Sequence, residues 1–194
     1  MKKRFGIDID GTVTRADSLL PYINRQFQLN LGLNDITEYD LTVATKTTQE
    51  EFGSWFYGVE AEIYENSALN DFAKETLTSW SSDHDLIYIS ARRSNLLTET
   101  TNWFHRHELP FHLVDLIGSH YKIEAAKKHQ VDIFFEDKHD NAVMLHEQLN
   151  IPVILFDTPY NRLPIPEGVI RVSNWKEAQH WVNNWIHLQK ETQR

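Results

Sequence analysis

The sequence contains no cysteine, which excludes disulfide bonds and metal sites that depend on thiolate ligands. It also lacks internal repeats, low-complexity tracts and any run of about 18 apolar residues, the length that a membrane-spanning helix needs. The N-terminal residues Met1 to Arg4 are not followed by the apolar stretch of a secretion signal. We therefore expect a cytoplasmic protein that has no membrane partner.

Positive charge is also scarce, because 19 Lys and Arg residues face 28 Asp and Glu residues, for a formal net charge of -9. Proteins that bind nucleic-acid polymers usually carry a basic stripe, so we expect no such partner. A small phosphate monoester stays compatible with this composition if a few cations gather around it. The chain has 194 residues, 41% of them hydrophobic, which suits one globular domain with a small insertion. Its oligomeric state is not indicated.

Short apolar segments alternate with helical patterns over most of the chain. The expected strands cover residues 4–9, 85–90, 111–117, 131–135 and 152–156. Helical periodicity covers residues 69–80, 94–107, 122–129, 141–149 and 175–188. Strands that alternate with helices predict βαβ units, and short, nearly all-apolar strands are typical of a sheet that is buried on both faces. We therefore expect an α/β fold with a doubly wound parallel sheet.

One long stretch breaks this alternation. Residues 15–66 contain two helical patterns around a turn-rich segment, and the second pattern opens with a capping signature formed by Thr48 and Glu51. We expect residues 15–66 to form a helical cap that is inserted after the first strand and covers the strand ends. Residues 1–14 and 67–194 would then form the α/β core.

The most informative motif is Asp8-Ile9-Asp10-Gly11-Thr12, at the end of the first expected strand. Strand side chains alternate between faces, so Asp8 and Asp10 point to the same side. Two carboxylates at a sheet edge repel each other and are costly to bury unless a cation or a reaction uses them. Gly11 allows the backbone to turn tightly beside them. This layout is typical of metal-assisted phosphoryl transfer, with one carboxylate as nucleophile and the other handling protons.

Polar residues also follow the next three expected strands, at the edge where parallel α/β sheets bind ligands. The second strand ends in Ser90-Ala91-Arg92-Arg93, Lys122 comes shortly after the third, and the fourth ends in Glu136-Asp137. Carboxylates, a hydroxyl group and cations are thus expected along one rim. Their occurrence at consecutive strand ends supports a phosphoryl-transfer site more strongly than any one of them alone.

In these motifs the chain resembles the haloacid-dehalogenase superfamily of phosphohydrolases. The match includes residues 8–12, Ser90, Lys122 and Glu136-Asp137, and it covers essentially the whole chain. Within the superfamily the chain looks most like the 5'(3')-deoxyribonucleotidase branch and its bacterial relatives, through residues 134–142 and the helical cap. The resemblance implies a Mg²⁺-dependent phosphomonoesterase with (deoxy)nucleoside 5'-monophosphates as substrates. The superfamily's dehalogenases lack an acid at the position of Asp10, which favours a phosphatase.

The resemblance also implies a role for each motif. Asp8 would be the nucleophile that forms an aspartyl phosphate, and Asp10 the general acid and base. Lys122 would neutralise the charge of the nucleophile and of the transferred phosphoryl group. The phosphate would contact Gly11, Thr12, Ser90, Ala91 and Arg92, and Mg²⁺ would be held by Asp8, the Asp10 backbone carbonyl, Glu136 and Asp137. Between the last two residues we favour Asp137 as the direct ligand.

Four aromatic residues of the expected cap, Phe52, Trp55, Phe56 and Tyr57, admit two interpretations. Consecutive large aromatic residues cannot all face one core, so at least one should face solvent or the active site. A nucleotide base could stack on a ring that faces the site. Ordinary packing of a small cap explains the same residues equally well.

Other residues also keep alternatives open. Asp140 and Asn141 would either support the metal ligands or cap a helix. Arg93 would be either a second cation of the site or, as we favour, a surface residue. No histidine spacing indicates a metal site. As alternative functions, the chain would be a phosphatase for another small metabolite, such as a sugar phosphate, or a non-catalytic phosphate-binding protein. The intact pair of Asp8 and Asp10 argues against the last of these.

Overall fold

The computed structural model describes residues 2–192; Met1 and residues 193–194, which belong to the expected core range, lie outside the described residues. Its centre is a six-stranded sheet with the order β3-β2-β1-β4-β5-β6, and every pairing is parallel. The strands are β1 (Arg4–Ile7), β2 (Asp85–Ser90), β3 (Leu113–Leu116), β4 (Ile133–Glu136), β5 (Val153–Phe156) and β6 (Val169–Val172). The predicted α/β class with a parallel sheet is confirmed.

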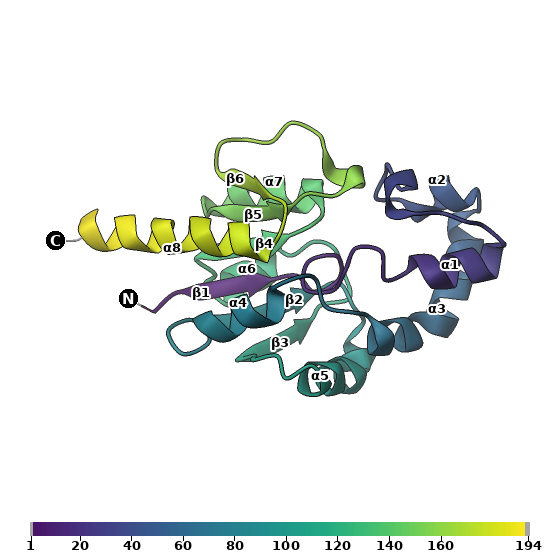
Figure 1. Cartoon of the computed structure of the whole chain (residues 1–194), viewed down its shortest axis with the longest axis horizontal. Helices are drawn as coiled ribbons and strands as arrows, with labels where there is room; N and C mark the ends of the chain where they lie inside the picture. The colour runs from purple at the N-terminus through teal and green to yellow at the C-terminus, as the bar shows by residue number, and fades with distance from the viewer. Residues whose placement is uncertain (1, 193–194) are drawn as a thin grey trace.

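Helices cover both faces of this sheet (Figure 1). The α-helices are α1 (Leu20–Phe27), α2 (Leu41–Thr45), α3 (Gln49–Asn66), α4 (Ala73–Trp80), α5 (Leu97–Arg106), α6 (Ile123–Lys128), α7 (His139–Leu149) and α8 (Trp175–Thr192). Three 3₁₀ turns are η1 (Leu33–Asp35), η2 (Ser94–Leu96) and η3 (Pro159–Asn161). Helices α4, α5 and α8 pack on one face, and α6 and α7 on the other. Alternate residues of β4 serve the two layers: Phe135 packs on the first and Phe134 on the second.

The sequence analysis missed β6, although the five predicted strands are present with boundaries that agree within two residues. Strand β6 pairs with β5 at the edge of the sheet, and its residues Ile170 and Arg171 are only partly buried. An edge strand of four residues that contains an arginine has too short an apolar run to be recognised by periodicity. Helix α2 was missed for a similar reason, since it is one short turn within the segment expected to be rich in turns.

Helices α1, α2 and α3 lie beyond the carboxyl ends of the strands, on the right in Figure 1. They share a small apolar cluster of their own around Leu20, Ile23 and Ile36. The predicted capping box of α3 is present, because Thr48 accepts the Glu51 N–H and the Glu51 carboxylate accepts the Thr48 N–H. The region has the position expected of a cap, while its division from the core at residues 15–66 stays a prediction.

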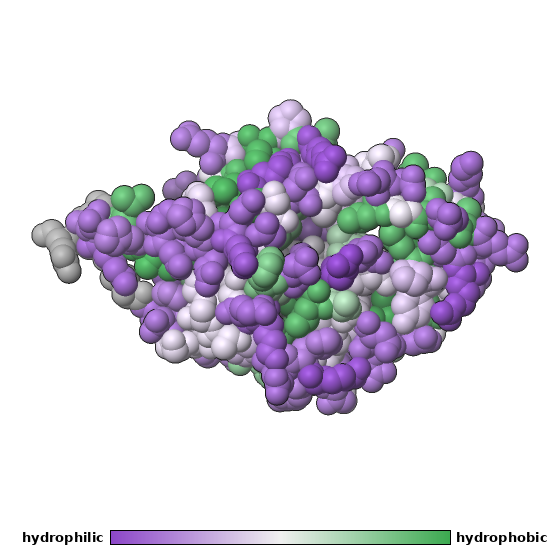
Figure 2. Space-filling view, in the orientation of Figure 1, coloured by the Kyte–Doolittle hydropathy of each residue, from purple (hydrophilic) through white to green (hydrophobic). Residues whose placement is uncertain are grey.

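The surface and the helices add two observations. Figure 2 shows hydrophobic patches on the cap and an opening between cap and core at the level of the strand ends. Among residues 2–192, no helix is both long enough and apolar enough to cross a membrane.

Candidate active site

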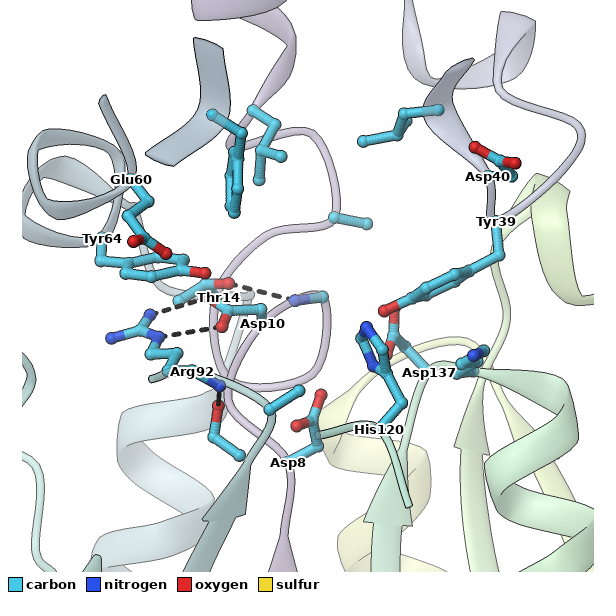
Figure 3. Close-up of a pocket in the computed structure, with 18 of the residues that line it drawn as sticks. Asp8, Asp10, Thr14, Tyr39, Asp40, Glu60, Tyr64, Arg92, His120 and Asp137 are labelled. Atoms are coloured by element: carbon cyan, nitrogen blue, oxygen red, sulfur yellow. Dashed lines mark hydrogen bonds and ion pairs between the residues drawn. The ribbon is translucent and has the colours of Figure 1, made fainter. Parts of the chain in front are cut away.

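A cavity of about 600 Å³ separates the rim of the sheet from the cap (Figure 3), a volume within the usual range for small-molecule sites. The rim side is polar and includes Asp8, Asp10, Ser90, Ala91, Lys122 and Asp137. The cap side is largely apolar and includes Leu19, Leu20, Ile36, Phe52, Phe56 and Tyr57. The structure thus brings most of the predicted site residues to one cavity.

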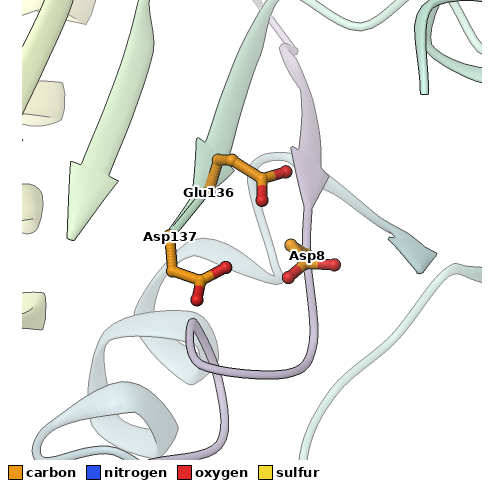
Figure 4. Close-up of side chains that lie close together, drawn as sticks. All are labelled: Asp8, Glu136 and Asp137. Carbon is orange, nitrogen blue, oxygen red and sulfur yellow. The ribbon is translucent and has the colours of Figure 1, made fainter. Parts of the chain in front are cut away.

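Three carboxylates meet at the base of this cavity, from Asp8 after β1 and from Glu136 and Asp137 at the end of β4 (Figure 4). One oxygen of each lies within 4.8 Å of the others, and all three residues are buried. Burial raises the pKa of Asp8 from 3.8 to about 7, although Lys122 acts in the opposite direction. Burial, Glu136 and Asp8 together raise the pKa of Asp137 well above its usual value. Three buried carboxylates this close repel each other when they are ionised, so their charged forms require positive charge nearby.

Lys122 supplies part of that charge. It lies just before α6, and its Nζ donates to Asp8 Oδ1 at 2.5 Å and to Glu136 Oε2 at 2.8 Å. Burial opposes the charged form, but the two carboxylates outweigh this effect and raise the Lys122 pKa above its usual value. Lys122 therefore stays protonated and holds Asp8 in a fixed position.

The two acidic residues after β4 differ in how their oxygens are used. Glu136 Oε2 accepts the Lys122 bond, and Oε1 accepts the Lys138 backbone N–H at 3.1 Å. Asp137 Oδ2 accepts the Tyr160 hydroxyl at 2.5 Å, whereas the buried Asp137 Oδ1 has no hydrogen-bond partner within residues 2–192. A buried acceptor without a partner is costly unless a ligand meets it. This difference favours Asp137 over Glu136 as a direct cation ligand.

Gly11 makes room for this arrangement. Its φ of +80° lies in the left-handed region, and an added Cβ would lie 2.2 Å from Asp137 Oδ2. The turn after Asp10 therefore needs glycine on both conformational and steric grounds. The Gly11 N–H donates to Thr14 Oγ1 at 3.1 Å, so this predicted phosphate donor already has a partner within the turn.

Asp10, also on the rim, lies across from Asp137 and is paired with Arg92 (Figure 3). Arg92 Nε donates to Asp10 Oδ2 at 2.9 Å, and Nη2 donates to Oδ1 at 2.7 Å. Its third nitrogen, Nη1, donates to Thr100 Oγ1 at 3.1 Å on α5. Arg92 also belongs to the cavity lining, so its contact with the substrate phosphate stays a prediction beside this pairing with Asp10.

The remaining predicted phosphate contacts divide into two groups. Ser90 and Ala91 line the cavity, and Ser90 Oγ accepts the Arg92 backbone N–H at 3.2 Å. Thr12 is fully buried behind the rim and is not among the residues that line the cavity. Its carbonyl accepts the indole N–H of Trp175 at 3.1 Å, so it ties the turn to α8.

The four aromatic residues of α3 also divide. Phe52, Phe56 and Tyr57 line the cavity, as expected if a ring faces the substrate. Trp55 does not line it, but packs edge-on against Phe27 with ring centres 5.1 Å apart. Trp55 thus fits the explanation by cap packing.

Arg93 combines the two roles that the sequence left open, a surface position and a second cation. Its side chain is exposed, and it also lines the cavity, pairs with Glu60 of α3 and lies over the Tyr57 ring, with 4.7 Å between its Cζ and the ring centre. Other cavity residues were not found from the sequence. Tyr39 of the cap also lines the cavity and contacts Tyr160 edge-on. No sequence pattern indicated this contact, because it depends on how the cap folds over the rim.

Asp140 and Asn141 lie in the first turn of α7. Asp140 is exposed and contacts His139, and no contact with the acidic cluster is found for it among the described residues. Asn141 is buried, and its Nδ2 has no hydrogen-bond partner among the described residues. Support of the metal ligands therefore stays a prediction, and its position fits Asn141 better than Asp140.

Comparison with known proteins identifies the family. Residues 3–188 match the family described as "5' nucleotidase, deoxy (Pyrimidine), cytosolic type C protein". The chain belongs to this nucleotidase family. It is 53% identical over 185 residues to a "Putative nucleotidase" of Halalkalibacterium halodurans, and 50% identical over 184 residues to another from Bacillus subtilis. Each match covers 95% of this chain and 95% of the relative.

Solved structures agree on the fold. A haloacid dehalogenase-like hydrolase from Streptococcus pneumoniae has a TM-score of 0.68 at 13% identity, over 93% of this chain and 98% of that one. A magnesium-bound HAD-hydrolase from Bacillus subtilis has a TM-score of 0.63 at 11% identity, over 94% and 99%. The predicted resemblance is confirmed: this nucleotidase family member is a phosphomonoesterase with a HAD-like fold.

Proposed function

We propose that the protein hydrolyses (deoxy)nucleoside 5'-monophosphates in a Mg²⁺-dependent reaction that passes through an aspartyl phosphate on Asp8. The observation that carries the metal-dependent part is the unpartnered Asp137 Oδ1 in the buried acidic cluster beside Asp8. An oxygen-only donor set suits a hard cation such as Mg²⁺. Asp8 and Asp137 would hold it, together with the backbone carbonyl of Asp10. When bound, the cation would offset negative charge on the phosphoryl oxygens.

The residues of the rim fit the two halves of the reaction. An Asp8 oxygen attacks phosphorus while the bond to the leaving oxygen breaks, and Asp10 gives that oxygen a proton. A water molecule then attacks the phosphorus, Asp10 takes up one of its protons, and inorganic phosphate leaves Asp8. Lys122, held at 2.5 Å from Asp8, offsets the charge of the nucleophile and of the phosphoryl group throughout.

The cap wall supports a nucleoside as the leaving group. Phe52 and Phe56 line the cavity with nearly parallel rings, 14° apart, and offer apolar surface to a flat base. The relatives named above are called nucleotidases, in agreement with this choice. A polar row of Asp40, Thr42 and Gln49 also lines the cap side, and it would suit the hydroxyl groups of a sugar phosphate. A sugar-phosphate phosphatase is therefore the second candidate.

The test is phosphate release from a panel of nucleoside 5'-monophosphates, nucleoside 3'-monophosphates and sugar phosphates, with Mg²⁺ and with a chelator. We expect the highest kcat/KM for a nucleoside 5'-monophosphate and loss of turnover with the chelator. Faster turnover of sugar phosphates would replace the proposed substrate class. Nucleotide binding without phosphate release would replace catalysis with binding.

A further inference from the structure

We infer that Arg92 is a positioning residue for Asp10, and that it links the position of cap helix α3 to the rim through Tyr64. The inference rests on the proposed function in one respect, the role of Asp10 in proton transfer to and from the substrate. Neither the family match nor the sequence motifs assign this task to Arg92, which the sequence placed among the phosphate contacts.

The contacts of Arg92 fix the Asp10 side chain at both oxygens. Two parallel bonds from one guanidinium group to one carboxylate restrict both its position and its orientation. Arg92 itself cannot move freely, because its side chain is fully buried and Nη1 is bonded to Thr100. The Asp10 side chain is 31% exposed, so it faces the cavity while Arg92 lies behind it.

The same guanidinium group touches the cap. Its Cζ lies 3.9 Å from the centre of the Tyr64 ring, which is close enough for a favourable cation–π contact. One helical turn earlier, Glu60 pairs with the next arginine, Arg93. Two consecutive residues after β2 therefore contact one face of α3, as Figure 3 shows for Tyr64 and Arg92. A shift of α3 relative to the rim must disturb Arg92, and through it Asp10.

Direct binding of phosphate by Arg92 fits this geometry less well. Arg92 belongs to the cavity lining, but its side chain has no solvent-exposed surface, and one N–H of each guanidinium nitrogen is already bonded to Asp10 or Thr100. Turning it toward a phosphate would break the pair with Asp10, and separating a buried ion pair is strongly unfavourable.

The experiment is a double-mutant cycle with Asp10→Asn, Arg92→Met and the double variant. Each is assayed on a nucleoside 5'-monophosphate, whose leaving oxygen needs a proton, and on p-nitrophenyl phosphate, whose leaving group needs little protonation. We expect Arg92→Met to lower kcat for the nucleotide by about 10²-fold, as for a misplaced catalytic group. The loss for p-nitrophenyl phosphate should be much smaller. In the Asp10→Asn background, Arg92→Met should add no more than about a twofold loss.

Arg106→Met is the matched control. Arg106 also ties α5 to α3, by donating to the Glu65 carbonyl at 2.9 Å, but it does not contact Asp10. This variant should keep the parent ratio between the two substrates. Equal losses of Arg92→Met on both substrates, or losses that multiply with those of Asp10→Asn, would overturn the inference.

Thermal unfolding would reveal whether Arg92→Met folds, and Tyr64→Leu is the second variant if it does not. Tyr64→Leu removes the ring over the guanidinium group, so it should lower the rate on the nucleotide more than the rate on p-nitrophenyl phosphate, by a smaller factor than Arg92→Met. An unchanged substrate ratio in a folded Tyr64→Leu protein would break the link to the cap, and Arg92→Lys would then test the Asp10 part alone. If Asp10→Asn itself turns over nucleotides at the parent rate, the proposed role of Asp10 fails and the inference fails with it. A defective Asp10→Asn together with an Arg92→Met variant that lacks the expected dependence on leaving group would overturn the inference alone.

Discussion

The rim of the sheet and the inner wall of the cap face the same cavity, but they are built in different ways. On the rim, Asp8 and Asp10 each have a cationic partner at hydrogen-bond distance, Lys122 and Arg92. On the wall, residues such as Phe56 contact their neighbours through rings and apolar surface. Directional bonds fix the positions of individual atoms, whereas apolar packing fixes mainly shape and volume. The rim thus suits a reaction that requires individual atoms in fixed positions. The inner wall of the cap suits the selection of substrates by their shape.

This difference predicts that changes at the nucleophile Asp8 and its partner Lys122 lower the rate for every substrate, whereas changes on the cap wall lower it for some. The largest effect should come from Asp8→Asn, because an amide cannot act as the attacking carboxylate. We expect the rate to fall by at least ~10³-fold on nucleotides and aryl phosphates alike. Asp115→Asn, which changes an ion-paired aspartate of β3 that does not line the cavity, is the control. Parent-like turnover by Asp8→Asn would exclude a covalent mechanism at this residue.

The next effect should come from Lys122→Met, which leaves two buried carboxylates without their cation. We expect kcat to fall by about 10²–10³, as when one electrostatic donor of a transition state is removed. Lys127→Met removes a lysine that is 51% exposed and paired with Glu124, so its rate should stay at the parent level. Because Lys122→Met also removes half of two buried ion pairs, unfolding is followed in parallel, and Lys122→Arg keeps the charge if the methionine variant does not fold. Equal defects in the two methionine variants would contradict the assignment of Lys122.

The acidic cluster should make stability depend on pH in the metal-free protein. The pKa of Asp8 is raised to about 7 and that of Asp137 well above its usual value, so the folded state holds these protons more tightly than the unfolded chain. This contribution is complete below pH 3.8, the ordinary pKa, and is lost as pH rises through about 7. Mg²⁺ should restore stability at the upper end, because it binds the ionised carboxylates.

Thermal unfolding at several pH values, with and without Mg²⁺, measures this effect. Asp137→Asn should lower the affinity for Mg²⁺, and with it the stabilisation by Mg²⁺. The loss of affinity should exceed the ~10–100-fold loss that changes in residues around the direct ligands cause. Glu136→Asn is unsuitable as its control because Glu136 holds Lys122, so Asp140→Asn on the exposed face of α7 is used. A metal-free protein whose stability rises between pH 5 and 8, taken as an approximate window around these pKa values, would reverse the assigned sign.

The same contrast explains what the sequence predicted. The rim was predictable because parallel strands bring their carboxyl ends to one edge, so the order Asp8, Ser90, Lys122 and Glu136 along the chain already implied a shared site. The roles of single atoms could not be predicted from the sequence. Whether Glu136 or Asp137 has a free oxygen, and whether Arg92 faces the cavity or Asp10, depends on side-chain rotamers that neighbouring elements select.

The cap was predictable only as a helical insertion in the right place. The order of its helices does not define which of their faces meet the rim, because the contacts that fix the cap join residues far apart in the sequence, such as Glu60 with Arg93 and Glu65 with Arg106. Tyr39 and Trp55 illustrate the consequence. Tyr39 reaches the cavity from a turn that carries no motif, and Trp55, which looks equivalent to Phe56 in sequence, packs on Phe27.

The smallest predicted effect uses this last pair, Phe56 and Trp55, which are adjacent on α3 and differ in whether they line the cavity. Phe56→Ala should lower kcat/KM for nucleoside 5'-monophosphates by about tenfold, the lower end of what stacking on a base contributes. Its activity on p-nitrophenyl phosphate should stay close to that of the parent, since that leaving group is too small to span the wall.

Trp55→Ala is the matched control, because it removes a ring of similar size from the same helix. It should reduce stability, by up to ~3 kcal/mol for a partly buried tryptophan, and leave the ratio between the two substrates unchanged. If both variants lower the nucleotide rate selectively, the wall acts through the folding of the whole cap rather than through the ring that faces the substrate. If neither changes the ratio, substrate choice resides on the rim, and the division of labour between rim and wall is wrong.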